Sequence, residues 1–464
     1  MSLATPTRTT AALVAALLVL GGALTACAAP PRDPRHLGVW TLENLEDRLA
    51  VQRASAQKFT DATGITVDTV GVDEDQFNQL ITASAASGTL PDVVGALPLA
   101  AVRSLAANQL LDPAASGRAV ADLGPETFAP RALELTRDGP AQLAVPSDAW
   151  PQLLLYRKDL FAAAGLPEPH TYADVTAAAT KLTTHDVAGF VGATTAGDAF
   201  TQQTFEHIAL ANGCEMVDAA GKVALDSPQC VAAFAFYDDL IRNHSVKGSQ
   251  DVDTTRATYF AGKAAMMIWS SFILDELAGL RDDAAPSCPQ CRADPRFLAD
   301  NTGIVTALQG PDAREPAQFG EVQSWAVLTD ANVDAATRFV EFMLSDGYPN
   351  FLSAAPEGKF PSRSGTKDAP TRYVDLWRTL PAGVDRKVPL AQIYPPQVLE
   401  ALSGSLNTFR RWGITQGQGA LVGATLGELP VPQAIAAMTS GEIDPVQAAR
   451  EATASVTELQ ESLE

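Results

Sequence analysis

The stretch that decides the fold is Val145–Leu182, VPSDAWPQLLLYRKDLFAAAGLPEPHTYADVTAAATKL. It opens with a proline and a polar turn that carries Trp150, and the apolar run Leu153–Tyr156 that follows is typical of a buried strand. After a small-residue turn, Thr171 and Asp174 have the spacing of a capping box at the start of a helix. The stretch therefore predicts a turn, a buried strand, a second turn and a helix.

The chain before this stretch alternates apolar runs with segments of helical periodicity. Leu37–Leu42 and Ile65–Val70 are predicted strands, and a third strand opens at Pro91. Strands and helices that alternate at such short spacing imply a parallel sheet with right-handed crossovers. Because 464 residues are too many for one simple core, we expect at least two domains.

The chain after the stretch repeats this mixture of strands and helices. Ala261–Ser270, AGKAAMMIWS, follows a helical segment and contains an apolar strand. Val322–Leu328 is a predicted strand, and Ala336–Leu344 is a predicted helix with one apolar face. The C-terminal region is predicted to be mainly helical, interrupted by a glycine-rich loop at Gly417–Pro432.

Several phrases resemble the family 1 extracellular solute-binding proteins, the carbohydrate receptors of ABC importers that are similar to maltose-binding protein. The matching phrases are Phe59–Val67, Gly88–Val93, Tyr156–Leu160, Gly165–Leu166, His170–Tyr172, Gly262–Met266 and Gly358–Pro361. Arg157 and Tyr172 depart from the Asn and Trp that are usual in the family, but neither change removes the turn or the cap. The resemblance covers nearly all of residues 37–464 and is weakest between Pro286 and Phe319.

The resemblance implies an α/β fold of the periplasmic-binding-protein type. Two lobes, each with a parallel-type sheet flanked by helices, would be joined by three strands and would close on a ligand by a hinge. The implied division is a signal peptide at 1–26, a lipid-anchored tether at 27–36, lobe 1 at 37–142 plus 304–354, and lobe 2 at 143–303 plus 355–464.

The N-terminus has the features of an export signal. Arg8 precedes the apolar segment Ala11–Leu20, which is about as long as the apolar region of a signal peptide and too short to span a bilayer comfortably. Leu24–Cys27 then resembles a bacterial lipobox, which predicts lipidation of Cys27; the alternative is an ordinary secretory signal with a chance cysteine. We expect an extracytoplasmic protein anchored by lipid to the outer face of the cell membrane.

The charge balance restricts the partners of the chain. Its 33 Lys and Arg residues against 54 Asp and Glu residues give a net charge of −21. This charge argues against nucleic-acid binding and would repel anionic lipid headgroups, so any membrane attachment should be covalent.

The four cysteines beyond Cys27 predict two disulfides in an exported chain. Three connectivities are possible, and the pairs Cys214–Cys230 and Cys288–Cys291 need the least rearrangement of the chain. The CxxC phrase at 288–291 could instead be a redox pair or half of a zinc site. A loop staple is favoured, because there is no second CxxC and no nearby pair of histidines.

The sequence contains no Walker A, HExxH or GxSxG motif, so we predict that the protein is not an enzyme and needs no cofactor or metal. A surface glycosidase is the rival from another class, since two suitably spaced carboxylates would suffice and the chain is rich in acidic residues.

Candidate ligand-binding residues follow from the chemistry of sugars. Hydroxyl groups need directional polar partners, and the C–H faces of sugar rings pack on flat aromatic rings. The candidates end predicted strands, lie at turns that the resemblance places at the cleft, or belong to the late glycine-rich loop. They are Trp40, Glu43, Asp148, Trp150, Trp269, Ser270, Trp325 and Glu428. Trp377 and Trp412 have helical surroundings and are expected in the core.

Together these observations predict a monomeric, lipid-anchored substrate-binding protein of an ABC importer. It would capture a sugar or small oligosaccharide and deliver it to the permease subunits. A glycerophosphodiester or another polar solute is the alternative ligand within the same class.

Overall fold

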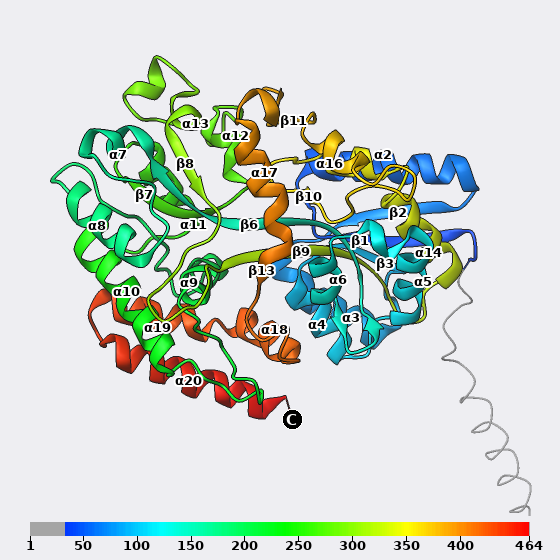
Figure 1. Cartoon of the computed structure of the whole chain (residues 1–464). Helices are drawn as coiled ribbons and strands as arrows, with labels where there is room; N and C mark the ends of the chain where they lie inside the picture. The colour runs from blue at the N-terminus through cyan, green and yellow to red at the C-terminus, as the bar shows by residue number, and fades with distance from the viewer. Residues whose placement is uncertain (1–32, 464) are drawn as a thin grey trace, which may run out of the picture.

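The computed structural model describes residues 33–463, and in it the chain forms two α/β lobes that share a curled, mixed sheet (Figure 1). The predicted signal peptide, Cys27 and most of the predicted tether lie outside the described residues. We call lobe 1 the part that carries β1–β3 and α2–α5, and lobe 2 the part that carries β7, β8 and α7–α13.

Lobe 1 begins with the predicted alternation of strands and helices. Its elements are β1 (His36–Thr41), α2 (Glu46–Thr63), β2 (Thr66–Gly71), α3 (Glu74–Ser87), β3 (Val93–Leu97), α4 (Leu99–Ala107), α5 (Pro113–Leu123), a 3-10 turn (Pro125–Thr127), α6 (Pro130–Leu135), β4 (Arg137–Asp138) and β5 (Ala141–Gln142). β1 lies between β2 and β3 and is parallel to both, as predicted. Gly64 ends α2 in the left-handed conformation, with φ of 72°.

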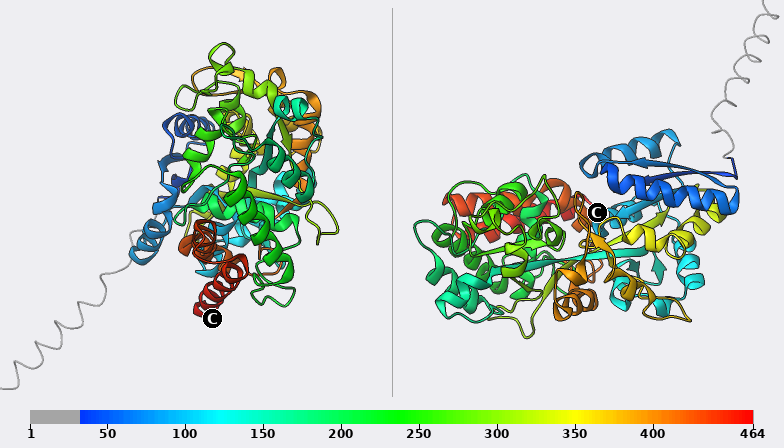
Figure 2. Two further views of the ribbon diagram at one scale, coloured as in Figure 1. Left: turned by 90° about the vertical axis from the view of Figure 1, so that its left-hand side faces the viewer. Right: turned by 90° about the horizontal axis from the view of Figure 1, so that it is seen from above.

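The strand β6 (Val145–Arg157) is buried along its whole length and extends from one lobe into the other (Figure 2). The predicted turn at its start is wrong, because residues 145–152 continue the strand. Pro146 and the polar residues after it suggested a turn, but β6 accommodates this proline at an irregularity in its pairing with β9 (Gln318–Val327), between Pro146 and Asp148. Trp150 therefore lies on a strand.

Lobe 2 continues from β6 and returns to it. Its elements are α7 (Lys158–Ala164), α8 (Tyr172–Leu182), α9 (Ala199–Ala211), α10 (Pro228–His244), α11 (Val252–Phe260), β7 (Met266–Ser270), α12 (Ile273–Leu277), a 3-10 turn (Gln290–Arg292), α13 (Phe297–Asn301) and β8 (Thr302–Val305). β7 and β8 are both antiparallel to β6. The predicted capping box is confirmed, since Thr171 and Asp174 exchange side-chain and backbone hydrogen bonds at the start of α8.

The remaining chain returns through β9 to lobe 1 and ends on lobe 2. Its elements are α14 (Val333–Met343), α15 (Tyr348–Leu352), β10 (Phe360–Pro361), α16 (Arg372–Trp377), β11 (Pro381–Ala382), β12 (Val388–Pro389), a 3-10 turn (Leu390–Gln392), α17 (Pro396–Ser405), a 3-10 turn (Leu406–Thr408), β13 (Phe409–Arg410), α18 (Gly419–Glu428), α19 (Pro430–Ser440) and α20 (Pro445–Ser462). The main sheet has the order β10-β6-β9-β3-β1-β2.

The predicted lobe boundaries stay a prediction. Within residues 355–464, neighbouring side chains pack in the cores of different lobes. Residues 355–464 were assigned to lobe 2, but Tyr373 packs in the same core as Phe339 and Trp325 of lobe 1. Trp377, one turn later, packs in a core of lobe 2. Trp377 and Trp412 are both buried, as expected.

The glycine-rich segment Gly417–Pro432 is largely helical, so the predicted loop is wrong. In α18 the residues Gly419, Gly423 and Gly427 are four apart and share one face. A Cβ at Gly419 would stand 2.4 Å from the Arg103 side chain, and one at Gly423 would stand 3.2 Å from the Ala100 carbonyl oxygen. Close packing on α4 thus overrides the poor helix propensity of glycine.

Both predicted disulfides are present, joining Cys214 to Cys230 and Cys288 to Cys291. The first ties the segment after α9 to the first turn of α10, and the second closes a short loop of lobe 2.

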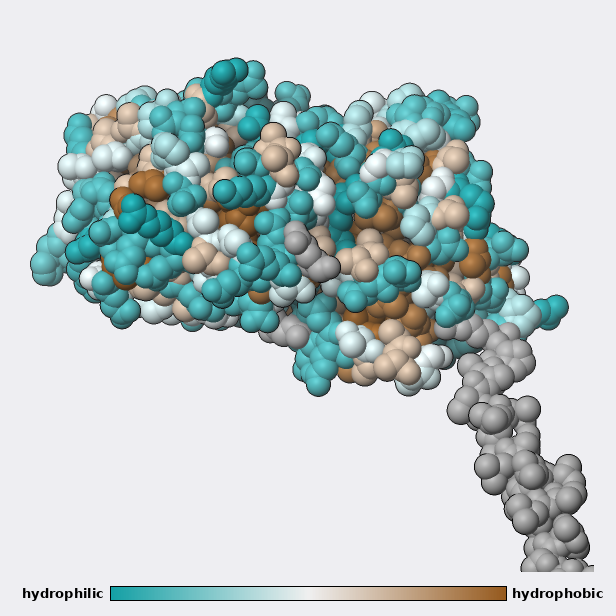
Figure 3. All heavy atoms as spheres, turned by 90° about the horizontal axis from the view of Figure 1, so that it is seen from below, coloured by the Kyte–Doolittle hydropathy of each residue, from teal (hydrophilic) through white to brown (hydrophobic). Residues whose placement is uncertain are grey.

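No single helix within residues 33–463 has the length and apolar character needed to cross a membrane, although α18 and α19 pass that test as a pair bent by 49°. In the same part of the chain, no group of three or more His, Cys, Asp or Glu side chains is arranged to hold a metal ion. On the face shown in Figure 3, hydrophilic residues cover most of the surface, and hydrophobic residues gather on the right-hand lobe.

Candidate functional site

Two adjoining cavities lie between the lobes. The aromatic cavity, of about 300 Å³, is lined by Leu42, Glu43, Arg48, Glu74, Ala96, Pro98, Trp150, Gln152, Phe200, Gln203, Val252, Trp269, Ser270, Phe272, Glu321 and Gln323. The small-residue cavity, of about 430 Å³, is lined by Leu42, Glu74, Phe77, Asn78, Pro98, Ala100, Ala101, Ser104, Gly197, Ala199, Gln203, Glu321, Gly423, Leu426, Gly427 and Leu429. Because the two cavities share lining residues, we treat them as one cleft.

Aromatic rings from lobe 2 and from β6 form one wall of the aromatic cavity. The ring of Trp269 lies 4.7 Å from the ring of Phe200, and the ring of Trp150 lies 6.3 Å from that of Phe272. Trp150 is 8% exposed and Trp269 is 5% exposed, so each presents only an edge or part of a face to the cavity. β6 and β7 are paired here, which holds both indoles on a rigid support.

The hydrogen bonding of the indole N–H groups distinguishes Trp150 and Trp269 from the core residues Trp377 and Trp412. Trp377 donates to the Pro356 carbonyl oxygen at 2.7 Å, and Trp412 donates to the Cys214 carbonyl oxygen at 2.9 Å. The indole N–H groups of Trp150 and Trp269 make no hydrogen bond to another residue between 33 and 463. They are therefore able to donate to a ligand hydroxyl in the cavity.

A buried cluster of charges lies at the junction of the lobes, at the edge of the aromatic cavity. Lys359 donates to Glu43 and lies 3.4 Å from a carboxylate oxygen of Asp148, and Arg48 lies 3.2 Å from Glu43. Burial by itself raises the pKa of Glu43, but Lys359 and Arg48 outweigh it and lower that pKa to about 2. Burial raises the pKa of Asp148, which Lys359 only partly offsets.

Glu321 on β9 lines both cavities and is held from two sides. One carboxylate oxygen accepts from the backbone N–H of Leu99, at the start of α4, at 2.9 Å. The other is bound by the fully buried Arg411, whose guanidinium also donates to Glu206 at 3.1 Å. Burial raises the pKa of Glu206, and Arg411 opposes that shift. The Glu321 carboxylate is thus fixed in place by these two contacts.

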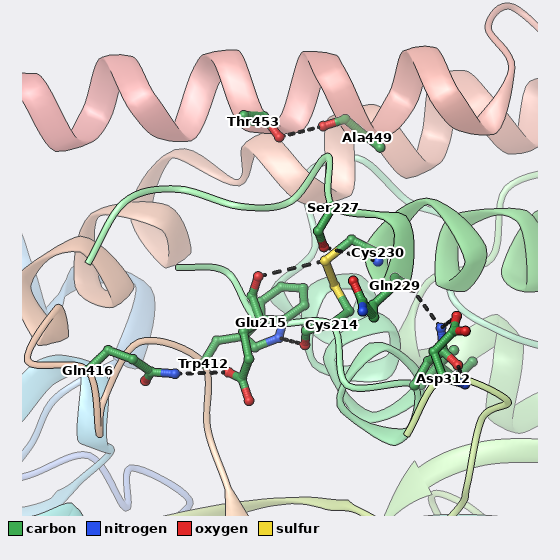
Figure 4. Close-up of a disulfide and its surroundings, with 12 residues drawn as sticks. Cys214, Glu215, Ser227, Gln229, Cys230, Asp312, Trp412, Gln416, Ala449 and Thr453 are labelled. Carbon is green, nitrogen blue, oxygen red and sulfur yellow. Dashed lines mark hydrogen bonds between the residues drawn. A yellow bond between two sulfur atoms is a disulfide. The ribbon is translucent and has the colours of Figure 1, made fainter. Parts of the chain in front are cut away.

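The disulfide between Cys214 and Cys230 supports the segment that carries Arg411. Figure 4 shows Trp412 beside the bond between Cys214 and Cys230, with its indole N–H directed at the Cys214 carbonyl. The backbone N–H of Trp412 donates to Glu206 at 2.8 Å, and the Gln416 amide reaches Glu215 at 3.3 Å. Cross-linking the segment after α9 to α10 therefore helps to hold Trp412, and with it the ion pair of Arg411 with Glu206, in place.

A second acidic group, made of Asp275, Glu276 and Glu357, lines neither cavity. Burial, and next the carboxylate of Asp275, raise the pKa of Glu357 to about 8. Burial raises the pKa of Asp275 to about 6, and burial, against the opposing charge of Arg256, raises the pKa of Glu276 to about 7. Arg48, which lies over the ring of Phe272 at 5.0 Å, partly offsets the raised pKa values of Glu357 and Asp275.

The structure brings part of the predicted site together. Glu43, Trp150, Trp269 and Ser270 all line the aromatic cavity. Trp40 is partly buried against the core of lobe 1 and lines neither cavity. Glu428 is exposed at the end of α18, although its neighbour Gly427 lines the small-residue cavity.

Two predicted residues are buried away from the cleft. Asp148 is 0% exposed and is occupied by Lys359 and by the hydroxyl of Ser147. Trp325 is 0% exposed, and its indole lies so close to Gly95 that a Cβ there would meet the ring at 2.4 Å. Trp325 thus fills the core of lobe 1 and does not face the cleft.

Several lining residues were not predicted, notably Arg48, Gln152, Phe272, Glu321 and Gln323. Gln152 is two residues after Trp150 on the same strand, so alternation along a strand would have placed both on one face. That signal was hidden by the assignment of a turn. Glu321 is a charged residue inside an apolar strand, which is itself a signal of a specific partner.

Comparison with known proteins identifies the family to which the chain belongs. The model of the family described as bacterial extracellular solute-binding protein matches residues 44–348. The putative ABC transporter periplasmic-binding protein YcjN of Escherichia coli K12 is 29% identical over 325 residues, which cover 68% of this chain and 70% of that protein.

Solved structures share the fold at lower sequence identity. The GacH receptor of Streptomyces glaucescens GLA.O, solved unliganded and with acarbose, superposes with a TM-score of 0.69 at 20% identity, covering 91% of this chain and 98% of that one. A sugar transporter protein of Arthrobacter chlorophenolicus A6 with bound laminaribiose gives 0.69 at 16% identity, covering 91% and 99%. Maltose-bound MalE3 of T. maritima gives 0.66 at 17% identity, covering 91% and 99%.

Proposed function

Because this chain belongs to the bacterial extracellular solute-binding proteins, we propose that it captures a neutral sugar or small oligosaccharide in the cleft between its lobes. It is a solute-binding protein of an ABC transporter, and the bound sugar would be delivered to the permease subunits. The observation that carries the proposal is the pair Trp150 and Trp269, which line one cavity with unpaired indole N–H groups. An aromatic face with a polar edge suits the C–H face and the hydroxyl groups of a sugar ring.

The charges of the cleft favour a neutral ligand over a glycerophosphodiester. Among the described residues that line the two cavities, Arg48 is the one cation, and Glu43, Glu74 and Glu321 are the carboxylates. Arg48 already pairs with Glu43, so a phosphate would have to compete for it in an acidic cleft. A phosphate site would instead be built from cations that are free to pair with the ligand.

The same charges favour a receptor over a glycosidase. A glycosidase needs a carboxylic acid that keeps its proton near neutral pH, beside a second carboxylate. Lys359 and Arg48 hold the pKa of Glu43 at about 2 against the effect of burial, and Glu321 is bound by Arg411 and by a backbone N–H. The carboxyl groups whose pKa burial raises most, such as those of Asp275, Glu276 and Glu357, lie outside both cavities.

The remaining parts of the proposal concern the location of the protein. The lipobox-like phrase Leu24–Cys27 supports lipidation of Cys27, which would anchor a monomer to the outer face of the cell membrane. The test is a Cys27→Ser variant, which should move from the detergent phase to the aqueous phase of a detergent split. Unchanged membrane association of that variant would contradict the anchor.

The sugar proposal is tested by thermal melting of the mature chain with a panel of ligands. A ligand that binds only the native state raises the melting temperature, so maltose, laminaribiose, acarbose and glycerophosphocholine can be ranked directly. We expect a rise with at least one neutral sugar and none with glycerophosphocholine. A rise with the phosphodiester alone would refute the proposal, and sugar cleavage detected by chromatography would favour the glycosidase.

A further inference from the structure

Gln152 is the polar residue of the cleft wall whose hydrogen-bonding groups are least satisfied. It lines the aromatic cavity, yet its side chain is 0% exposed to bulk solvent. Neither its amide oxygen nor its amide nitrogen has a hydrogen-bond partner among residues 33–463. Buried amides almost always have partners, because an unpaired one loses its bonds to water without replacement. A buried amide without partners at a cavity wall therefore calls for a ligand.

The local structure fixes where this amide lies. Gln152 is two residues after Trp150 on β6, so the two side chains are on the same face of the strand. Across the sheet it pairs with Ser270 of β7, so these two side chains share a face, and both residues line the cavity. Trp269 precedes Ser270 on β7 and pairs with Leu153, so its indole reaches the cavity from the other face. The Gln152 amide, the Ser270 hydroxyl and the Trp150 indole are thus on one face of paired strands, which hold them at a fixed spacing.

We propose that Gln152 determines which sugar the cleft accepts, by binding two adjacent hydroxyl groups of the ligand. One hydroxyl would donate to Oε1 of Gln152 while its neighbour accepts from Nε2. This inference rests on the proposed sugar-binding function and adds a residue that discriminates between sugars. A ligand that lacks either hydroxyl leaves a buried amide group unpaired, and sites built in this way reject such analogues strongly.

The chain offers a matched control for the substitution. Gln318, at the start of β9, is 1% exposed and leaves its Nε2 without a partner, but it lines neither of the two cavities. Gln152→Leu and Gln318→Leu therefore make the same chemical change in similarly buried strands, one inside the cleft and one outside it.

The experiment is titration calorimetry of both variants and the wild type with the neutral sugar that binds the wild type best. We expect Gln152→Leu to weaken affinity at least tenfold and Gln318→Leu to leave it within twofold. The melting temperature of ligand-free Gln152→Leu should not fall, because the leucine removes an amide that has no partner in the protein. Equal affinities for the two variants would overturn the inference.

Monodeoxy derivatives of the same sugar supply the second measurement. Removing one of the two recognised hydroxyls should weaken binding to the wild type at least tenfold and binding to Gln152→Leu less than threefold. If every deoxy sugar loses the same factor in both proteins, Gln152 does not read a hydroxyl and the inference fails. If the wild type binds no neutral sugar at all, the proposed function fails with it, whereas a sugar-binding wild type with an unaffected Gln152→Leu variant refutes only the role of Gln152.

Discussion

The two walls of the aromatic cavity are built from different chemistry. The wall from β6 and lobe 2 carries Trp150, Trp269, Phe200 and Phe272, whereas the opposite wall carries charged side chains such as Glu43 and Arg48. The charges are already paired within the protein, while the indole N–H groups are not. We therefore propose that the aromatic wall supplies ligand affinity and that the paired charges of the other wall stabilise the junction of the lobes.

The largest effect is expected where the charged wall is disrupted. Lys359→Met leaves the carboxylates of Glu43 and Asp148 buried without their shared cation, which should lower the free energy of unfolding by about 3–5 kcal/mol. Urea unfolding measures this change, and Lys58→Met, at an exposed position, is the control. If Lys359→Met lowers the free energy of unfolding no more than the control does, the buried ion pairs of Lys359 do not stabilise the protein.

Trp325→Ala tests the distinction between core and cleft tryptophans. Trp325 is 0% exposed and packs against Phe339 and Phe351, so its removal should cost about 3–5 kcal/mol of stability. Sugar affinity, measured by calorimetry in the folded fraction, should stay the same. Weaker binding with an unchanged melting temperature would place Trp325 in the cleft and contradict the structure.

Trp150→Ala and Trp269→Ala should show the reverse pattern. Each removes an aromatic surface that lines the cavity, and we expect about 2 kcal/mol of lost binding energy, or roughly a thirtyfold weaker affinity. Some stability will also be lost, because both rings pack on neighbours, but affinity should fall in the folded fraction. Unchanged affinity in both variants, with a large fall in melting temperature, would show that these rings are core residues.

The smallest effect concerns pH and the acidic group behind the cleft. Burial, followed by the charge of Asp275, raises the pKa of Glu357 from 4.5 to about 8, so the native state holds its proton more tightly than the unfolded state. Its contribution to stability is complete below pH 4.5 and is lost as the pH rises through about 8. One such proton changes the free energy of unfolding by up to about 1.4 kcal/mol per pH unit.

Melting curves between pH 5 and 8 measure this slope. Glu357→Gln should make the decline in stability shallower, and Glu461→Gln, at an exposed position, should not. Some decline will persist in Glu357→Gln, because burial also raises the pKa values of Asp275 and Glu276. An identical slope in Glu357→Gln and the wild type would mean that Glu357 is ionised in the folded protein at neutral pH.

The sequence predicts more of the fold than of the candidate site. Local signals determined the opening strands and helices, the cap at Thr171 and both disulfides, because these depend on neighbours in sequence. The start of β6 and the helix α18 were missed, since prolines and glycines are turn signals until close packing overrides them. Asp148 looked like a ligand group because its partner Lys359 is distant in the sequence.

The most direct test of the account is a crystal structure of the mature chain with the neutral sugar that raises its melting temperature most. We predict a sugar ring against Trp150 or Trp269, adjacent hydroxyls at the amide of Gln152, and Arg48 still paired with Glu43. A ligand bound outside this cleft, or a charged ligand group that takes Arg48 from Glu43, would contradict the central claim.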